Sequence, residues 1–336
     1  MKNRSNVIFR VDAGMNAGFG HLSRCTTLAH ALEEYDIKSS FVVNTDNNCL
    51  VHDFISNKKL NNYNVNVCGI NSLIDDANHT ANEFHKGYNF LILDHYNHNI
   101  EYQNILRRKD VRWAQFDYHK QNRIKADVII NPNIGITDEE YSNLREPHSI
   151  LCVGEKYSII RRDLIGVEYT PNIKRVLIAM GAGEYPKEVI SLIKLIITNK
   201  SFHFDIISNC RELDELKELT NVTVYSNPSD VIQIYKHSRI AVVSGGVTSH
   251  ELAYLGIPMF IVPYAENHKV NAVSCEDKKL GLRFNDTNEF IQYLKIKSLE
   301  LIISELEDEC NNNKEIIDGL GAHRISAVIS NSINHV

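Results

Sequence analysis

The chain has 336 residues, of which 43% are hydrophobic and 23% charged, and a formal net charge of −6 at pH 7. These proportions are typical of a globular protein long enough for two domains, and they exclude a disordered chain or a bundle of membrane spans. The mild acidity, with no basic block, argues against nucleic acid or an anionic membrane as a partner.

The N-terminus and the cysteines predict a cytoplasmic protein. The polar start Met1-Lys2-Asn3-Arg4 is followed by only a short apolar stretch, which runs into Arg10 and Asp12 and is too brief and too charged for a secretory signal. The 7 cysteines are odd in number, scattered and without a Cys-x-x-Cys pair. This pattern argues against a disulfide framework and a zinc site, so we expect a reduced compartment. No cofactor is expected, and no metal.

Short apolar runs alternate with amphipathic stretches along the whole chain, which is typical of parallel strands joined by crossover helices. In the first half we expect strands at Val7–Val11, Phe41–Val43, Asn64–Val67, Phe90–Asp94, Arg112–Phe116 and Val128–Ile130. A helix is expected from His21 onward, because Leu22, Cys25, Ala29 and Leu32 recur at helical spacing.

A glycine-rich loop follows the first expected strand. Gly14, Gly18 and Gly20 let the backbone approach a ligand, although their spacing is neither a dinucleotide fingerprint nor a P-loop. His21 would begin the helix, where the helix N-terminus disfavours the imidazolium ion and suits a general base. A histidine that only closes the loop by hydrogen bonding remains an alternative. Arg24 would face the same cleft, unless it is a solvated helix arginine.

The strand that ends at Asp94 is followed by His95 and Tyr96. A carboxylate and a phenol at the carboxyl end of a strand are well placed to bind sugar hydroxyls or to orient a water molecule. A cap for the helix expected near Asn99 is the alternative for Asp94. His95 and His98 lack partners at metal-ligand spacing, so we expect no metal there.

The second half repeats the alternation. Strands are expected at Arg175–Met180, Phe204–Ile207, Val222–Tyr225, Ile240–Val243 and Met259–Val262. The polar stretch around Pro171 divides a domain of residues 1–168 from one of residues 172–336, whose last stretch we expect to be a helix packing back across the domains. We predict two doubly wound, Rossmann-like α/β domains that face each other across a cleft lined by the loops after the strands.

Two glycines and a helix follow the strand that ends at Val243. Backbone N–H groups at Gly246, Val247 and Thr248 would hold the diphosphate of a nucleotide, because a helix N-terminus favours an anion. Glu251, one turn further on, could bind a ribose diol. A capping box made of Thr248 and Glu251 is the alternative.

Further loops complete the expected nucleotide site. Gly181 and Gly183 follow the first strand of the second half and would bring backbone N–H groups to the cleft. Asn267 and His268 follow its last strong strand and could contact the base or a phosphate, although a polar turn into a helix has the same sequence pattern.

Taken together, Gly18-Phe19-Gly20-His21 with Arg24, Asp94-His95-Tyr96, Gly246-Val247-Thr248 with Glu251, and Asn267 resemble a known family. It is the nucleotide-sugar hydrolase family of pseudaminic acid biosynthesis, which removes UDP from a 2,4-diacetamido-2,4,6-trideoxy-altrose. The similarity covers nearly the whole chain and includes Gly154–Arg161, near the end of the first domain.

The resemblance implies a GT-B fold and a UDP-sugar substrate. It implies that His21 serves the attack of water on the anomeric carbon, with inversion and without metal. It also implies ribose binding by Glu251 and nucleotide binding by Asn267. The sugar-binding residues expected from the first domain are Arg10, Asp12, Gly18, Gly20, Arg24, Asp94 and Tyr96.

Alternatives to the hydrolase use the same nucleotide site. They are a GT-B glycosyltransferase with a sugar acceptor, a hydrolysing 2-epimerase, and a nucleotide-sugar binding protein without catalysis. The sequence leaves the exact sugar and the oligomeric state open.

Overall fold

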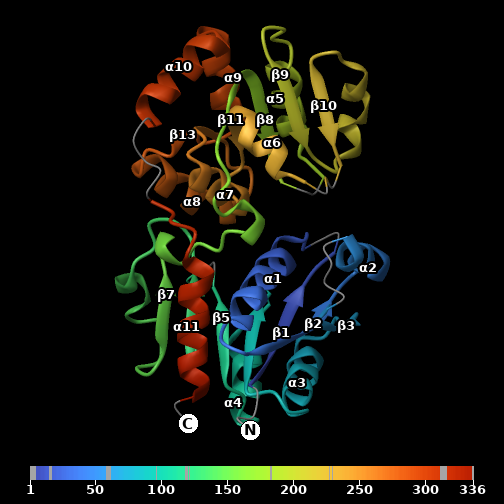
Figure 1. Ribbon diagram of the computed structural model, residues 1–336, viewed down its shortest axis with the longest axis vertical. Coiled ribbons are helices and arrows are strands. Elements are labelled where there is room, and N and C mark those ends of the chain that lie inside the picture. Colours follow the sequence, from blue (N-terminus) through green and yellow to red (C-terminus); the bar gives the residue numbers. More distant parts are fainter. Residues whose placement is uncertain are drawn as a thin grey trace. The chain divides into compact units, whose positions relative to one another are not determined.

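The computed structural model describes residues 5–14, 17–57, 62–95, 97–117, 120, 122–181, 184–226, 228, 230–310 and 316–334, without the side chains of residues 57, 266 and 267. Contacts along the chain divide it into two compact units. The first unit comprises Met1–Ile159 and Gly319–Val336, and the second comprises Ile160–Asp318. Each unit is built on one parallel sheet (Figure 1).

The first sheet has the strand order β3-β2-β1-β4-β5-β6-β7, and all its pairings are parallel. Its strands are β1 (Asn6–Asp12), β2 (Lys38–Asn44), β3 (Asn64–Cys68), β4 (Phe90–Asp94), β5 (Trp113–Phe116), β6 (Val128–Asn131) and β7 (Ile150–Val153). The α-helices described in this unit are α1 (Gly20–Glu33), α2 (Asn48–Asn57), α3 (Leu73–Phe84), α4 (Ile100–Arg108) and α11 (Gly321–Asn334).

The central strands of this sheet are buried on both faces. On β1, Val7 and Phe9 pack in an apolar layer with residues of α1 and α11, whereas Ile8 packs in a layer with residues of α3 and α4. On β4, Ile92 belongs to the first layer and Leu93 to the second. Side chains of successive residues point to opposite faces of a strand, so a continuous apolar run suits a sheet covered on both sides.

The last helix, α11, packs on the first unit. Ala322, Ile325 and Ile329 are buried in the same core as residues of α1, and Arg112 donates a hydrogen bond to the carbonyl of Ser332. The sequence-based division differs here, because it assigned residues 319–336 to the second domain. The helix belongs to the first unit because its apolar stripe is buried there.

The second sheet has the strand order β10-β9-β8-β11-β12-β13, again with parallel pairings. Its strands are β8 (Asn172–Ala179), β9 (His203–Ile207), β10 (Val222–Tyr225), β11 (Ser238–Val243), β12 (Met259–Ile261) and β13 (Gly281–Arg283). The α-helices described here are α5 (Lys187–Ile196), α6 (Ile232–His237), α7 (Val247–Leu255), α8 (Glu266–Asp277), α9 (Thr287–Ile296) and α10 (Leu299–Cys310).

The chain also forms short 3-10 helices. They are η2 (Asp138–Tyr141), η3 (Glu155–Tyr157), η4 (Arg162–Leu164) and η5 (Arg211–Glu218). None of the helices in the described ranges is both long and apolar enough to cross a bilayer.

In both sheets, most of the predicted site residues follow the strands between which the strand order reverses, whereas Asn267 and His268 follow β12. In the first sheet β1 lies next to β4, and in the second β8 lies next to β11. Ligands of doubly wound sheets bind at the carboxyl ends of such neighbouring strands. The predicted fold class, two doubly wound Rossmann-like domains, is therefore confirmed.

Candidate functional site

The loop between β1 and α1 is closed by a pair of glycines. The Gly14 N–H donates to the Gly18 carbonyl at 3.2 Å, and the Gly18 N–H donates to the Gly14 carbonyl at 2.9 Å. A Cβ atom on Gly14 would lie 2.0 Å from Asp46 Oδ1, so the approach of that side chain requires glycine. At Gly18 and Gly20 a Cβ atom would meet no described atom within 4 Å. The loop thus exposes bare backbone just before His21.

His21 lies in the first turn of α1 and is buried, with 2% of its surface exposed. Its Nδ1 atom lies 2.7 Å from Oδ1 of Asp94, the last residue of β4. This pair forms because β1 and β4 are neighbours, so the helix that follows β1 begins beside the end of β4. Nε2 lies on the other side of the imidazole and is the ring nitrogen that faces away from the carboxylate.

Asp94 is fully buried and is bound by several donors. Arg24 donates from Nε to Oδ2 at 2.6 Å and from Nη2 to Oδ1 at 2.7 Å, and the Cys25 thiol donates to Oδ2 at 3.3 Å. Burial alone would raise the pKa of Asp94. The charges of Arg24 and His21, with their hydrogen bonds, outweigh burial and hold that pKa well below its usual range. Asp94 is therefore a carboxylate at any physiological pH.

The protons of this cluster can be arranged in two ways, because Arg24 Nη2 also lies 2.7 Å from His21 Nδ1. If Nδ1 carries the proton, His21 donates to Asp94 and Nε2 can accept a proton from a substrate, as a general base does. If Nδ1 is bare, it accepts from Arg24, and the histidine is a structural link. Both alternatives weighed for His21 fit this geometry.

Arg24 and Asp94 are bound to each other, and the simpler alternatives weighed for these two residues do not hold. Arg24 has 8% of its surface exposed and lies over the ring of Phe116, 5.2 Å from its centroid, so the solvated-arginine alternative is wrong. Asn99 itself caps α4 by accepting hydrogen bonds from two backbone N–H groups, so the helix-cap alternative for Asp94 is wrong as well. Sugar binding by either residue remains a prediction.

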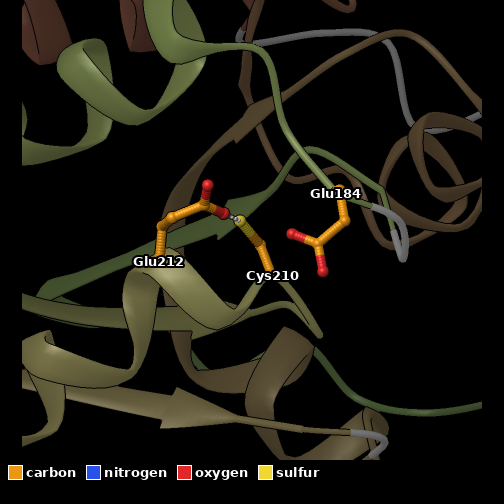
Figure 2. A group of neighbouring side chains, drawn as sticks. All are labelled: Glu184, Cys210 and Glu212. Carbon is orange, nitrogen blue, oxygen red and sulfur yellow. Dashed lines mark hydrogen bonds between the residues drawn. The ribbon is translucent and has the colours of Figure 1, made fainter.

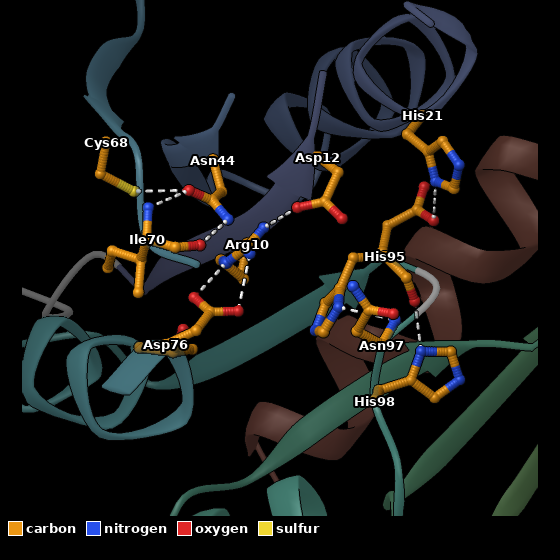
Figure 3. A network of polar contacts seen from close by, with 12 residues as sticks. Arg10, Asp12, His21, Asn44, Cys68, Ile70, Asp76, His95, Asn97 and His98 are labelled. Atoms are coloured by element: carbon orange, nitrogen blue, oxygen red, sulfur yellow. Dashed lines mark hydrogen bonds and ion pairs between the residues drawn. The ribbon is translucent and has the colours of Figure 1, made fainter. Parts of the chain in front are cut away.

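A second ion-pair network lies on the same sheet (Figure 3). Arg10 has 1% of its surface exposed. It donates to both carboxylate oxygens of Asp76 on α3, at 2.8 and 2.7 Å, and to Asp12 at 2.7 Å. Asp12 retains 19% exposure of its side chain. Arg10 thus holds Asp12 in place at the end of β1, and Asp12 is the more accessible of the two predicted sugar-binding residues.

Two histidines follow Asp94 (Figure 3). His95 is buried, and burial, followed by the charges of Arg10 and His98, holds its pKa well below the usual range. Its Nδ1 accepts a hydrogen bond from the backbone N–H of Asn97 at 3.2 Å, and His98 Nδ1 contacts the His95 carbonyl. Among the described residues, these histidines belong to no group that could jointly hold a metal ion.

The group whose ligand atoms do lie together comprises Glu184, Cys210 and Glu212, within 4.8 Å of one another (Figure 2). The Cys210 thiol donates to Glu212 Oε2 at 3.1 Å. Burial and this hydrogen bond raise the pKa of Cys210 to about 11, so the thiol is protonated at neutral pH. In this state the thiol serves as a hydrogen-bond donor to Glu212.

In the second unit, β11 ends at a helix N-terminus made of bare backbone. Gly245 has φ 93°, and a Cβ atom there would lie 3.0 Å from the His268 carbonyl oxygen, so the turn requires glycine. Gly246 is the N-cap of α7, and no side chain caps it. The capping-box alternative is therefore wrong, since Thr248 and Glu251 lie inside the helix. Val247, its first residue, has 41% of its surface exposed.

Glu251 is part of a buried ion pair. Its Oε1 lies 3.1 Å from Arg161 Nε, and the side chains have 11% and 19% exposure, respectively. Burial, followed by the negative charge of Glu251, raises the pKa of the buried Tyr235. The residue expected to bind ribose thus lies one turn beyond the helix start, already oriented by a cation.

Other predicted nucleotide contacts gather around the same helix start. His268 Nε2 would lie 3.6 Å from a Cβ atom on Gly246, and burial lowers the pKa of His268. Its ring packs edge-on against Tyr264, whose hydroxyl would lie 3.1 Å from a Cβ atom on Gly181. Asn271 binds the turn from α8, donating to the Gly245 carbonyl at 2.8 Å. Tyr96, Gly183 and the side chain of Asn267 lie outside the described residues.

Sequence reasoning missed several of these partners. Asp76 lies in the acidic first turn of α3, which on its own predicts only a helix start. Arg161 directly follows two buried isoleucines, and Asn271 lies inside α8, so neither position carries a local signal for its partner. The strand order could have linked His21 with Asp94, because both lie where the order reverses.

No protein-family model matches the chain. An uncharacterized protein of Methanocaldococcus jannaschii is 21% identical over 272 residues, which are 75% of this chain and 54% of the relative. The chain therefore spans about half the length of that curated relative.

Solved structures match over nearly the whole chain. A co-structure of S. aureus MnaA with UDP has a TM-score of 0.71 at 11% identity and covers 99% of this chain and 98% of its own. MurG of Acinetobacter baumannii has a TM-score of 0.64 at 11% identity, over 97% and 99%. A UDP-GlcNAc 2-epimerase of Neisseria meningitidis, bound to UDP-GlcNAc, has a TM-score of 0.63 at 12% identity and covers 96% of this chain and 99% of its own. These matches show that the fold is GT-B.

Proposed function

We propose that the protein is a hydrolase that cleaves a UDP-activated sugar at its anomeric carbon and releases UDP and the free sugar. The observation that carries the proposal is the pair of His21 and Asp94, 2.7 Å apart where the strand order of the first sheet reverses. A histidine that is oriented by a buried carboxylate is suited to act as a general base, which removes a proton during the reaction. The structural neighbours that bind UDP or UDP-GlcNAc supply the substrate class.

In this proposal the nucleotide binds at the start of α7. Backbone N–H groups at Gly246, Val247 and Thr248 hold the diphosphate, because the first turn of a helix leaves donors unpaired and its dipole favours an anion. Glu251 accepts hydrogen bonds from the ribose diol. His268, beside Gly246, lies within reach of the same ligand.

Catalysis then follows from proton transfer to His21. Asp94 accepts a hydrogen bond from the Nδ1–H group of His21 and stays ionised, which leaves the lone pair of Nε2 to take a proton from water. The water oxygen bonds to the anomeric carbon as the bond to the diphosphate oxygen breaks, and UDP leaves as an anion stabilised by the helix start. Attack opposite the leaving group inverts the anomeric configuration. Such general-base help is worth about 10²–10⁴ in rate.

The sugar we propose is a 2,4-diacetamido-2,4,6-trideoxy hexose, as in nonulosonate biosynthesis of the pseudaminic acid type. This step rests on the sequence motifs around His21, Asp94 and Glu251. Asp12, held by Arg10 and partly exposed, is the described carboxylate best placed to accept hydrogen bonds from the sugar.

A hydrolysing 2-epimerase is the second candidate, because several structural neighbours are UDP-GlcNAc 2-epimerases. A glycosyltransferase is the third, since MurG is another neighbour. The three differ in what they do with a UDP-sugar when no acceptor is present.

The test is incubation of the purified protein with UDP-GlcNAc and with a UDP-2,4-diacetamido-2,4,6-trideoxy hexose, without an acceptor. A hydrolase releases UDP and a sugar of unchanged configuration at C2, and an epimerase releases the C2 epimer. Release of UDP only after a sugar acceptor is added contradicts hydrolysis and supports transfer.

A further inference from the structure

The first residues of the second unit lie next to Glu251, the carboxylate proposed to bind ribose. Its boundary lies at Ile160, and the next residue, Arg161, pairs with Glu251 at 3.1 Å. The two residues are 90 positions apart in the chain, so the pair is a tertiary contact that fastens the entry of the chain into this unit to α7.

Glu251 is the dominant partner of Arg161. Among the described residues, Asp163 is the other carboxylate within ion-pair distance, but it is 3.8 Å away and its side chain is 66% exposed. Water screens an exposed pair strongly, whereas Glu251 and Arg161 have little exposure. Burial works against the Arg161 charge, and the negative charge of Glu251 is the largest influence that raises its pKa.

The pair fixes the direction of the Glu251 side chain. A glutamate alone has three rotatable bonds, and holding it in one rotamer costs conformational entropy when a ligand binds. Here Arg161 forms an ion pair with one carboxylate oxygen, and it comes from outside the helix. A carboxylate offers about four acceptor positions, so a fixed carboxylate can still accept from further hydroxyls.

We propose that Arg161 is the positioning residue for ribose recognition. It orients the Glu251 carboxylate so that its two oxygens accept hydrogen bonds from the two neighbouring hydroxyls of the ribose. Arg161 itself does not contact the phosphates, which bind at the start of α7. This inference rests on the proposed nucleotide site and adds how that site distinguishes a ribonucleotide from a nucleotide without the diol.

The experiment measures the affinity of the protein for UDP and for 2′,3′-dideoxy-UDP by calorimetry. The ratio of the two dissociation constants isolates the diol from the phosphates and the base. Wild type is expected to prefer UDP by about 10-fold or more, since two charge-assisted hydrogen bonds are lost with the diol. Glu251→Gln, which keeps the shape and loses the charge, is expected to lower this ratio towards 1 and serves as the reference.

Arg161→Gln is expected to lower the ratio in the same way while changing the affinity for 2′,3′-dideoxy-UDP less than about 3-fold. Arg161→Lys keeps the charge and is expected to give an intermediate ratio, which tests the inference even if Arg161→Gln folds poorly. The matched control is Arg162→Gln, because Arg162 is the exposed neighbour, and its ratio is expected to equal that of wild type.

The outcomes separate this inference from the function. A ratio that stays at the wild-type value in both Arg161 variants overturns the inference alone. Equal weakening of both nucleotides also overturns it, because Arg161 would then contact phosphate or hold the fold. A wild-type protein that binds neither nucleotide overturns the proposed function, and the inference with it.

Discussion

Replacing Asp94 by asparagine removes a negative charge and keeps almost the same volume. In the native protein this carboxylate is 0% exposed and accepts hydrogen bonds from Arg24, with His21 at 2.7 Å and the Cys25 thiol at 3.3 Å. An asparagine amide has only one acceptor oxygen, so its NH₂ group would face a donor of Arg24 where the carboxylate now accepts a hydrogen bond. Asp94→Asn therefore leaves the Arg24 charge buried without its counter-ion.

Removing one member of a buried ion pair costs about 3–5 kcal/mol. For a domain of 150–250 residues, 1 kcal/mol corresponds to roughly 2–4 °C in Tm. We expect Asp94→Asn to lower the Tm of the first unit by roughly 6–20 °C. The matched control is Asp53→Asn on α2, an exposed carboxylate of the same unit, which should change stability by less than about 0.5 kcal/mol.

The pH dependence gives an independent check. The pKa of Asp94 is lowered in the folded protein, with burial opposing the charges of Arg24 and His21. A group of this kind contributes its full stability above the pKa of the unfolded chain, about 4, and loses it as the pH falls towards the folded value. The difference between wild type and Asp94→Asn should be constant from pH 5 to 8 and shrink below pH 4.

The assay is urea unfolding followed by circular dichroism at several pH values. Equal stability of the two proteins at pH 7 would refute the ion-pair account of Asp94. A difference that grows on acidification would refute the sign of its pKa shift.

Three further substitutions test other parts of the molecule. His21→Ala should lower kcat by about 10²–10⁴ and leave the Kd for UDP nearly unchanged; His30→Ala on the same helix, which contacts Tyr63, should keep full activity in the same assays. Gly245→Ala places a side chain at φ 93°, 3.0 Å from a carbonyl oxygen, and the resulting strain of about 1–3 kcal/mol should weaken UDP binding measured by calorimetry; unchanged affinity would mean that the turn is not part of the site. Ile325→Ala opens a cavity in α11 and should cost about 2–5 kcal/mol in the first unit, so limited proteolysis on heating should cut residues 1–159 before residues 160–318, and the reverse order would contradict the assignment of α11.

Among the described strands, the sequence predicts the central ones and two of the four at the sheet edges, β3 and β10. β4 agrees with the predicted Phe90–Asp94 because every residue is buried and the run is continuous. β7 was not predicted, since it is a short edge strand whose first residue, Ile150, is 45% exposed. β13 lies at an edge of the second sheet and was missed because it has only 3 residues.

The candidate site was predictable in its positions but not in its partners. Glycines and polar residues after β1 and β11 mark the loops, because ligands of doubly wound sheets bind at the carboxyl ends of the strands. The pairing of Glu251 with Arg161 depends on tertiary packing, and neither residue carries a local signal for the other. The same holds for Arg10 and Asp76, which are 66 residues apart.

The central claim is that water attacks the anomeric carbon of a UDP-sugar, and isotope labelling tests it most directly. The protein is incubated with a UDP-2,4-diacetamido-2,4,6-trideoxy hexose in oxygen-18 water without an acceptor, and the released UDP is analysed by mass spectrometry. The account predicts rapid release of UDP that contains no heavy oxygen, because the bond that breaks joins the anomeric carbon to the diphosphate oxygen. Label in the UDP, or no release without an acceptor, would contradict it.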